Sequence, residues 1–315
     1  MKTTVLTPEE MRAEERLLWS VYARQHQLGS PFLSWAFVNV IGRVRDDVRV
    51  AVVEDGGTLG FFPFQTRSDQ TGVPVGAGIS DAQAFMAPQP WTFDPRRLLA
   101  GAGLAGWGFD HLLVEQAPFA PYHRSRHRVP VVDLGDGYEA FTARLGSHSR
   151  DFLPQVLRRR RKLEREVGPV TFEWSASDAD GAMRALREWK SAQYRRTGVW
   201  DRFSHPWIAE AIDRLSSAVE PDCTGVLGIL RASDRLAAVH LGLRSVDRLC
   251  WWFPAYDPEL GRYSPGLILL LELIAAGAAR HVPVLDLGRG EHGYKLRVAD
   301  RFYEVAEGEV TSGES

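Results

Sequence analysis

Cysteine is scarce in this chain of 315 residues. The two cysteines, Cys223 and Cys250, are too few to build a disulfide framework, so we expect the protein to work in a reducing compartment. The sequence also contains no cysteine cluster of the kind that binds zinc, no Walker loop and no GxSxG nucleophile elbow. It therefore gives no indication of a zinc module, a P-loop NTPase or a hydrolase built on that elbow.

The chain also lacks a strong net charge and a long hydrophobic run. Its formal net charge of −2 excludes a generally basic nucleic-acid binder. The longest apolar run, Gly266 to Ala279, is too short to cross a bilayer and carries Glu272 in its middle. Residues 1–15 have no apolar signal core and are predicted to form a capped surface helix. We therefore expect a soluble, cytoplasmic protein with no membrane span.

Two short patterns resemble cofactor or metal sites but carry little weight. Residues 101–106 match the GxGxxG pattern, yet they follow a helical pattern rather than a strand. His123 and His127 have the spacing of metal ligands on a helix, but they fall in a predicted loop, residues 117–128, without supporting carboxylates. We therefore expect neither a dinucleotide nor a metal.

The remaining composition, 44% hydrophobic and 25% charged, is that of a globular protein with one large or two ordinary domains. A Gly135-Asp136-Gly137 turn after the predicted strand Val129–Leu134 divides the chain into residues 1–134 and 135–315. Both parts order helices, a hairpin and a crossover in a similar way. We therefore expect an α/β fold with a mixed sheet, built as two similar halves that face each other.

Periodicity and turn signals define the main elements. Two hairpins are predicted, at Val48–Val53 with Thr58–Gln65 and at Gly225–Ala232 with Arg235–Ser245. The segment Pro31–Ile41 fits either a helix or a strand. Helices are predicted at Pro8–Gln27, Pro95–Leu104, Tyr138–Leu145, Phe152–Val167, Asp178–Thr197 and Pro206–Val219, and further strands at His111–Glu115, Val170–Trp174 and Phe302–Val305.

The most informative stretch runs from Leu249 to Lys295. It reads as strand Leu249–Phe253, loop Pro254–Tyr263, helix Ser264–Arg280 and strand Val282–Leu287. Ser264 suits the N-cap of the helix and Pro265 its first position. A strand, a helix and a strand in this order predict two parallel strands joined by a right-handed crossover.

The start of that helix is a candidate anion site. The backbone N–H groups of Gly266, Leu267 and Ile268 are expected to lack partners, and the positive end of the helix dipole adds to their attraction for phosphate or carboxylate. Gly266 has no side chain to keep an anion away. The alternative is that every helix has such a start and most bind nothing.

At this point the chain resembles a known family. The segments AAVHLGLRS (Ala237–Ser245), WWFPAYDP (Trp251–Pro258), RYSPGLILL (Arg262–Leu270) and LDLGRGEHGYKLR (Leu285–Arg297) resemble GNAT-superfamily acyltransferases of the CelD/BcsL type, associated with cellulose and exopolysaccharide biosynthesis. In the first half, GGTLGFFPFQ (Gly56–Gln65) and GISDAQAF (Gly78–Phe85) are similar to the same Fem-like, tandem-GNAT group. The resemblance implies two GNAT-like halves and transfer of an acyl group from acetyl-CoA or another acyl-CoA to an amine or hydroxyl of a sugar, amino acid or lipid precursor.

One departure leaves the donor open. The usual acyl-CoA signature is Arg or Gln, two residues, Gly, one residue, and Gly or Ala, whereas Gly261–Gly266 reads GRYSPG. Fem-like enzymes that use aminoacyl-tRNA also lack the signature, so tRNA is an alternative donor. A non-catalytic scaffold in exopolysaccharide assembly is the third possibility.

The resemblance also suggests residues for each role. The donor's pantetheine is expected between the strands Leu249–Phe253 and Val282–Leu287, and its pyrophosphate on the helix start. The residues expected to bind the donor are Trp252, Phe253, Arg262, Tyr263, Ser264, Gly266 and Leu267. Asp81 and Gln83 are candidates for holding the acceptor in a crevice between the halves.

Acyl transfer needs a group that takes the acceptor's proton, donors for the oxyanion and a proton for the leaving group. His240 is either a base or a core histidine. Asp286 either handles the acceptor's proton, by orienting a base or accepting the proton itself, or caps the Gly288–Gly290 turn. Lys295 is either an anion-binding cation or a surface lysine. Tyr256, Tyr263 and Tyr294 are candidate proton donors whose alternative role is packing.

The strongest charge feature is the basic run Arg158–Lys162. Its ordinary interpretation is a solvated helix face, and its functional interpretation is contact with a polyanion such as the CoA 3′-phosphate, tRNA or an acidic polysaccharide.

Overall fold

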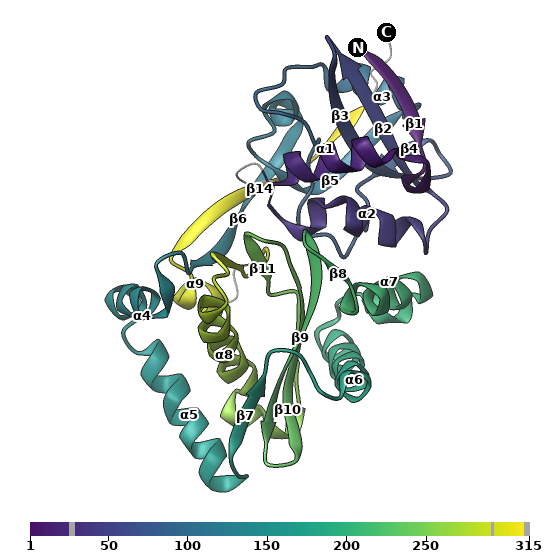
Figure 1. Cartoon of the computed structure of the whole chain (residues 1–315). Coiled ribbons are helices and arrows are strands. Elements are labelled where there is room, and N and C mark those ends of the chain that lie inside the picture. Colours follow the sequence, from purple (N-terminus) through teal and green to yellow (C-terminus); the bar gives the residue numbers. More distant parts are fainter. Residues whose placement is uncertain (25–28, 291–292, 312–315) are drawn as a thin grey trace. The chain divides into compact units, whose positions relative to one another are not determined.

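A computed structural model describes residues 1–24, 29–290 and 293–311, which form two compact units (Figure 1). Unit 1 comprises the described residues of Met1–Arg128, Glu220–Cys223 and Tyr303–Ser315. Unit 2 comprises those of Val129–Val219 and Thr224–Phe302. Compact units need not coincide with domains, so the division into residues 1–134 and 135–315 stays a prediction.

Unit 1 is built on a mixed sheet. Its strand order is β1-β2-β3-β4-β5-β14, with β1 Lys2–Leu6, β2 Val48–Asp55, β3 Thr58–Thr66, β4 Thr71–Val73, β5 Gly106–Leu113 and β14 Arg301–Thr311. The predicted β2–β3 hairpin is confirmed, and Gly56 and Gly57 turn the chain with φ of 58° and 82°. Glycine suits both turn positions because its lack of a Cβ permits positive φ.

The prediction of a surface helix at the N-terminus was wrong for its first residues. Lys2–Leu6 pairs antiparallel with β2, since Thr3, Thr4 and Val5 are β-branched and suit a strand. The capping signal belongs to the 3-10 turn Pro8–Glu10, where the Glu10 carboxylate accepts from the Thr7 amide at 2.8 Å. The helix α1 follows at Ala13–Ala23.

Two further helices complete unit 1. The ambiguous segment after Ser30 is helical, with a 3-10 turn at Pro31–Leu33 and α2 at Trp35–Gly42. The helix α3 spans Pro95–Gly101 and begins after an N-cap at Asp94. The core of the unit is rich in aromatic rings, among them Phe62 and Trp107 with centroids 4.9 Å apart.

The strands that lie mainly in unit 2 also run in mixed directions and belong to the same 14-stranded sheet. Their order is β6-β13-β11-β10-β9-β7, and β12 also pairs with β10, with β6 His123–Asp133, β7 Val170–Glu173, β9 Cys223–Ala232, β10 Arg235–Arg244, β11 Arg248–Cys250, β12 Phe253–Tyr256 and β13 Val284–Asp286. The short β8 at Val219–Glu220 pairs with β9. The β9–β10 hairpin and the parallel pairing of β11 with β13 were both predicted and are confirmed.

Helices cover both faces of the β9–β10 region (Figure 1). On one side lie α4 Gly137–His148, α5 Phe152–Glu166 and α8 Pro265–Ala279, and on the other lie α6 Ala179–Thr197 and α7 Pro206–Ser216. The helix α9 at Gly293–Val298 was not predicted. Helices and a mixed sheet in both units confirm the mixed α/β class.

Several strands are longer than predicted, β6 and β14 by the most. β6 begins at His123 rather than Val129, and β14 continues to Thr311 rather than ending at Val305. His123 and His127 therefore lie on a strand, and no group of three potential metal ligands occurs among the described residues. The GxGxxG-like segment begins at the last residue of α3, so it follows a helix rather than a strand, as expected.

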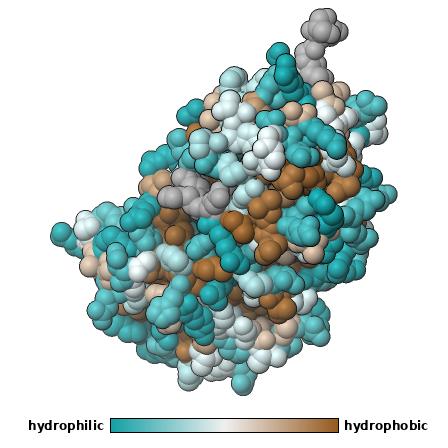
Figure 2. Space-filling model, turned by 45° about the horizontal axis from the view of Figure 1, so that its top comes forward, coloured by the Kyte–Doolittle hydropathy of each residue, from teal (hydrophilic) through white to brown (hydrophobic). Residues whose placement is uncertain are grey.

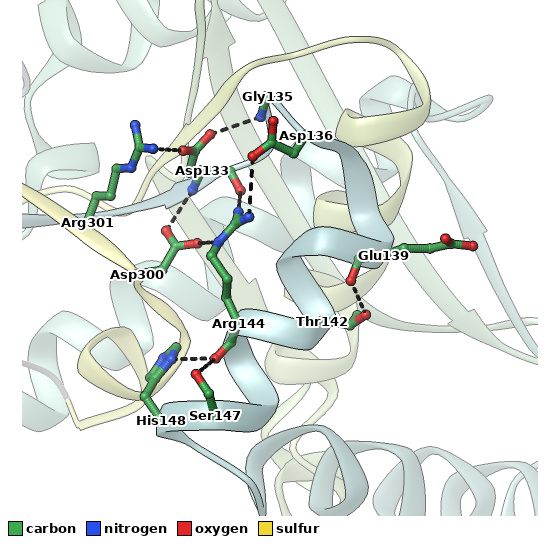
Figure 3. Close-up of polar contacts among 10 residues, drawn as sticks. All are labelled: Asp133, Gly135, Asp136, Glu139, Thr142, Arg144, Ser147, His148, Asp300 and Arg301. Carbon is green, nitrogen blue, oxygen red and sulfur yellow. Dashed lines mark hydrogen bonds and ion pairs between the residues drawn. The ribbon is translucent and has the colours of Figure 1, made fainter.

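An ionic network fastens the end of β6 to the helix and strand ends beside it (Figure 3). Arg144 of α4 donates to Asp300 at 2.8 Å, and the Asp300 carboxylate accepts from the backbone N–H of Asp133 at 2.8 Å. Arg301 reaches the carboxylate of Asp133 at 2.6 Å. These contacts fix the residues just before α4 and just after α9 in one place.

The surface face drawn in Figure 2 is largely hydrophilic, with hydrophobic residues in separate groups. Exposed large hydrophobic side chains include Leu17 and Val21 on α1. Within the described ranges, no helix combines the length and the apolar content that a membrane crossing requires.

Candidate active site

The predicted strand Leu249–Phe253 is interrupted in the structure. β11 ends at Cys250 and β12 begins at Phe253, and the two tryptophans between them leave the ladder. Both strands pair with β10, but only β11 pairs with β13, over three residues. The Trp251 amide adds one further bond, to the Asp286 carbonyl at 2.7 Å. Beyond it, β12 follows β10, and the sheet opens between β12 and β13.

A pocket of about 430 Å³ lies at this opening, entirely within unit 2. Its volume is in the range of small-molecule sites, about 300–1,000 Å³. It brings together the strand interruption, β12, the start of α8, one side of α6 and the start of α9. Its lining consists of Lys190, Gln193, Trp251, Trp252, Pro254, Tyr256, Gly261, Ser264, Gly266, Leu267, Tyr294 and Lys295.

The start of α8 borders the pocket, but it offers fewer N–H donors than expected. Ser264 is the N-cap residue, in a left-handed conformation with φ of 51°. The amides of Leu267 and Ile268 both donate to the Ser264 carbonyl, at 3.0 and 3.3 Å. The expectation that they lack partners was therefore wrong, because the N-cap carbonyl accepts from both. Since Pro265 has no N–H, the Gly266 amide is the group without a protein acceptor among the described residues of this helix start.

The basic run of α5 supplies a cation to the same place. Arg159 donates to the Ser264 hydroxyl at 2.7 Å, so the serine side chain is held by the arginine and does not cap its own helix. Arg160 is bound to Glu272 of α8 at 2.7 Å. Arg158 and Arg161 are exposed. The run is thus partly a docking face for α8 and partly a solvated surface.

Arg262 and Tyr263 do not line the pocket. Tyr263 is fully buried, and its hydroxyl donates to Glu166 at 2.8 Å. Arg262 contacts the Tyr263 hydroxyl and Glu166. The hydrogen bond from Tyr263 is the largest cause that lowers the pKa of Glu166. Both predicted donor-binding residues therefore join α5 to the loop before α8, whereas Ser264, Gly266 and Leu267 reach the pocket.

Of the two predicted aromatic residues, Trp252 lines the pocket and Phe253 does not. Phe253 packs on Phe203, with ring centroids 5.3 Å apart. The Phe253 ring also packs on Trp252, with centroids 4.5 Å apart, so Phe253 supports the tryptophan and does not line the pocket itself.

His240 lies behind the pocket wall. It is fully buried on β10, its ring stacks on Trp251 at 4.4 Å, and its Nε2 accepts the Trp252 amide at 3.3 Å. A Cβ at Gly242 would lie 2.5 Å from the His240 ring, so the glycine makes room for it. Burial lowers the pKa of His240 to about 3. This geometry is that of a neutral core histidine that positions the two tryptophans, and it corrects the expectation of a base in contact with the acceptor.

Asp286 is also set back from the pocket. One carboxylate oxygen accepts the Gly288 amide at 2.9 Å, and the other pairs with Arg248 at 2.7 Å. Of the two roles considered for Asp286, the cap of the Gly288 turn is present in the structure. With both oxygens engaged and its side chain 5% exposed, the carboxylate positions the turn after β13 rather than meeting a bound molecule.

Two predicted tyrosines line the pocket. Tyr256 is 41% exposed, and its ring would lie 3.5 Å from a Cβ added at Gly266. The Tyr294 hydroxyl accepts from the Trp251 indole at 3.1 Å. Burial raises the pKa of Tyr294, so its phenol keeps its proton near neutral pH.

Lys295 is not the surface lysine of the alternative interpretation. It is 7% exposed, and its ammonium donates to the carbonyls of Gly288 and Arg289, both at 3.1 Å. A second lysine of the pocket, Lys190 of α6, was missed in the sequence. It lies 105 residues before Lys295 and has no local motif, but lysine is rare here: the chain has four lysines and thirty-four arginines. The scarcity of lysine was the one feature of the sequence that could have drawn attention to Lys190.

The two acceptor-binding candidates belong to unit 1. Gln83 is buried and engaged at both ends of its amide: Nε2 donates to Asp110 at 2.5 Å, and Oε1 accepts the amides of Asp110 and His111 at 3.1 and 3.0 Å. Asp81 is half-buried in the loop before it. In the structure, Gln83 holds this loop on β5.

Comparisons with known proteins agree with this architecture. Residues 150–296 match the model of a family described as an acetyltransferase (GNAT) domain, and this stretch contains every residue that lines the pocket. None of the curated proteins matches the chain.

Several solved structures share the fold. FemX is 10% identical, with a TM-score of 0.59 over 98% of this chain and 96% of that one. The C-terminal domain of a proposed lysylphosphatidylglycerol synthetase from Agrobacterium fabrum is 13% identical, with a TM-score of 0.58 over 96% and 93%. A conserved protein of unknown function from Bacteroides thetaiotaomicron is 10% identical, with a TM-score of 0.58 over 95% and 98%. The chain thus contains a region similar to GNAT acetyltransferase domains, within a fold shared along its whole length with FemX.

Proposed function

We propose that the protein is an acyltransferase that moves an acetyl or other acyl group from acyl-CoA to an amine or hydroxyl acceptor, with the reaction in the pocket of unit 2. The observation that carries the proposal is the pocket itself. It lies at the opening between β12 and β13, it is lined by Gly266, and it falls wholly within the stretch that matches GNAT domains.

The residues at the mouth fit the diphosphate of an acyl carrier. The Gly266 amide and the positive end of the α8 dipole attract an anion, and Arg159 adds a full positive charge through its contact with Ser264. The absence of a side chain at Gly266 leaves room beside Tyr256. Trp252 and Leu267 supply apolar walls for the part of the carrier that enters the pocket.

The chemistry requires an oxyanion to be stabilised and a thiolate to be protonated. Lys295 lines the pocket wall, and we assign to it the stabilisation of the oxyanion. Tyr294 retains its proton and lines the pocket, so we assign to it protonation of the departing thiolate; Tyr256 is the second candidate for that role. His240 and Asp286 position the tryptophans and the turn around these groups.

The acceptor is the least constrained part of the proposal. The CelD/BcsL-type resemblance favours a sugar or another precursor in exopolysaccharide synthesis. Asp81 and Gln83 stay proposed acceptor-binding residues, although the hydrogen bonds of Gln83 already explain its presence.

Thiol release from acetyl-CoA tests the proposal, measured with a panel of amino sugars, amino acids and hydroxyl acceptors. We expect acceptor-dependent release of free CoA and a rise in melting temperature on adding CoA, as for any ligand that binds only the folded state. A protein that neither binds CoA nor releases thiol with any acceptor class contradicts it.

A second candidate is Fem-like aminoacyl transfer from tRNA. It is favoured by the missing acyl-CoA signature and by the exposed Arg158, Arg161 and Lys162 of α5. It predicts binding of charged tRNA with a steep dependence on salt, which acyl-CoA transfer does not. A scaffold in exopolysaccharide assembly predicts neither CoA binding nor tRNA binding.

A further inference from the structure

Lysine is concentrated in one place in this chain. Only four of its thirty-eight basic residues are lysines, yet two of the four line the same pocket. Lys190 and Lys295 are 8% and 7% exposed, respectively. Arginine cannot lose its proton in a protein, whereas a buried lysine can. Nearly every basic residue of the chain is an arginine, yet both basic residues that line this pocket are lysines, which can lose their proton.

The nitrogen of Lys190 is held in a defined geometry. It donates to the Pro254 carbonyl of β12 at 3.0 Å and to the Gln193 side chain at 3.1 Å, and it lies 5.5 Å from the Tyr194 ring. A lysine nitrogen has three positions besides its bond to the chain. Two are occupied by these acceptors. In the neutral amine the third position is a lone pair, and the side chain lines the pocket.

The charges around Lys190 favour that neutral form. Burial lowers the pKa of Lys190 to about 8, and the positive charges of Arg202 and Lys295 lower it further in the same direction. Asp201, on the turn that carries Arg202, already accepts from the Ser191 hydroxyl and the Phe203 amide. His240 of β10 is neutral.

No carboxylate takes part in the described lining of the pocket, so the usual acidic base is missing there. His240 and Asp286 lie behind the wall, and the Tyr294 phenol keeps its proton. Of the groups that reach the pocket, Lys190 is the one whose environment suits a proton acceptor at mildly alkaline pH.

We propose that the neutral amine of Lys190 is the catalytic base that takes the acceptor's proton during acyl transfer. This inference rests on the proposed acyltransferase function. The acceptor nitrogen or oxygen forms a bond to the thioester carbon, and the carbon–sulfur bond breaks. The acceptor's proton moves to Nζ of Lys190, which becomes an ammonium and later returns the proton to solvent. The thiolate leaves and takes the proton of Tyr294, which regains one from solvent, so the step balances without an oxidant or another reactant.

The main experiment follows kcat and KM against pH for the wild-type protein, Lys190→Arg and Lys190→Gln, with Lys2→Arg, at an exposed lysine of β1, as matched control. We expect wild-type kcat to rise with pH and level off above the Lys190 pKa of about 8. Both Lys190 variants should lose roughly 100-fold or more in kcat, with KM changed by less than about threefold, and should lose this inflection. The control should behave as wild type.

A measurement without catalysis uses the small number of lysines. With ¹³C-labelled lysine, the NMR spectrum of the side-chain methylene next to each ammonium contains four signals, and the one lost in Lys190→Arg identifies Lys190. Its titration midpoint should lie near 8 and should move upward in Arg202→Gln, because a repelling charge is removed. The kinetic inflection should move with it.

The outcomes separate the two proposals. If wild-type protein turns over acyl-CoA but Lys190→Arg keeps its kcat or its pH inflection, then Lys190 is not the base while the acyltransferase function stands. A Lys190 signal that titrates near 10.5, the ordinary lysine value, also overturns the assignment. If wild-type protein neither binds CoA nor releases thiol, the acyltransferase function itself fails. Retained CoA binding and an unchanged melting temperature show that the Lys190 variants are folded.

Discussion

Each unit has a hollow lined by charged groups, and the two hollows differ in how those charges are neutralised. In unit 1 a pocket of about 350 Å³ is lined by two arginines and three carboxylates. Arg124 pairs with Glu309 at 2.5 Å, and Asp110 accepts from Gln83. In unit 2 the described lining has two lysines and no carboxylate. The first hollow carries charges of both signs, whereas the charged residues in the described lining of the second are both lysines.

The difference teaches what distinguishes a binding site from an ordinary hollow in this fold. Polar residues occur in both, so their presence decides nothing. In unit 1 the Gln83 amide is engaged at both ends by protein groups, with one donation from Nε2 and two bonds accepted by Oε1. In unit 2 the Gly266 amide lacks a protein acceptor among the described residues, and Lys190 has two acceptors for three positions. Unmet hydrogen-bonding capacity at a pocket wall is the physical mark of a ligand site.

The largest expected effect comes from closing the mouth of the unit 2 pocket. In Gly266→Val the new side chain contacts Tyr256 and covers the helix start, since even a Cβ lies 3.5 Å from that ring. We expect at least a roughly 100-fold loss in kcat/KM for acyl-CoA, equivalent to about 2.7 kcal/mol, and loss of the CoA-induced rise in melting temperature. Gly146→Val is the control, because a Cβ there meets nothing within 4 Å. Unchanged CoA binding in Gly266→Val removes α8 from the donor site.

A substitution in unit 1 tests whether Gln83 has a structural role and no role in binding. Gln83→Leu leaves the buried amides of Asp110 and His111 without their side-chain acceptor. We expect the free energy of unfolding to fall by about 2–3 kcal/mol in urea titrations, with kcat and the acceptor KM within about twofold of wild type. A selective rise in acceptor KM, without loss of stability, would instead support Gln83 as an acceptor-binding residue.

The buried His240 predicts a defined dependence of stability on pH. Its pKa is about 3 in the folded protein against an ordinary 6.5, so the unfolded chain binds a proton more readily. Its contribution to stability is therefore complete above about pH 6.5 and falls as the pH drops toward 3. Between pH 6.5 and 5 we expect a loss of about 2 kcal/mol in the free energy of unfolding. His240→Asn should reduce this acid slope, and an identical slope in the variant contradicts the assignment.

The smallest effect concerns the hydroxyl that joins α5 to α8. Ser264→Ala removes the acceptor of the Arg159 hydrogen bond but leaves the Gly266 amide in place. We expect the Kd for CoA to rise by about threefold, or roughly 0.6 kcal/mol, and the melting temperature to change little. Isothermal titration at two salt concentrations measures it. Ser147→Ala, at an exposed hydroxyl of α4, is the matched control.

Much of the fold follows from local sequence. Gly56-Gly57 predicted the first hairpin, Asp178 predicted the start of α6, and Ser264-Pro265 predicted the start of α8. These signals depend on backbone conformation within a few residues, so they can be read along the chain. The prediction missed β1 and the first part of β6. Neither Lys2–Leu6 nor His123–Arg128 has a hydrophobic alternation, so these segments form strands because of the strands they pair with.

Only the part of the candidate site that lies within one local sequence pattern could be predicted. Gly266, Leu267, Trp252 and Tyr294 lie in one stretch whose pattern indicates a crossover, and all four line the pocket. Arg262 and Tyr263 lie in the same stretch yet point to Glu166 of α5. Lys190 comes from a distant helix, and its place depends on the packing of α6 against β12, which no local pattern specifies.

The interruption of the strand at Trp251 and Trp252 has a consequence for which substitutions the pocket can accept. The gap between β12 and β13 arises where main-chain pairing stops, and the residues that pair β10 with β11 and β12 do not depend on the size of the side chains facing the gap. Substitution of Tyr256, Leu267 or Trp252 is therefore expected to change the shape of the pocket and to leave the backbone pairing of the surrounding strands intact. If the protein is the proposed acyltransferase, we expect substitutions of these three side chains to change its acyl-chain preference while the strand pairing stays intact.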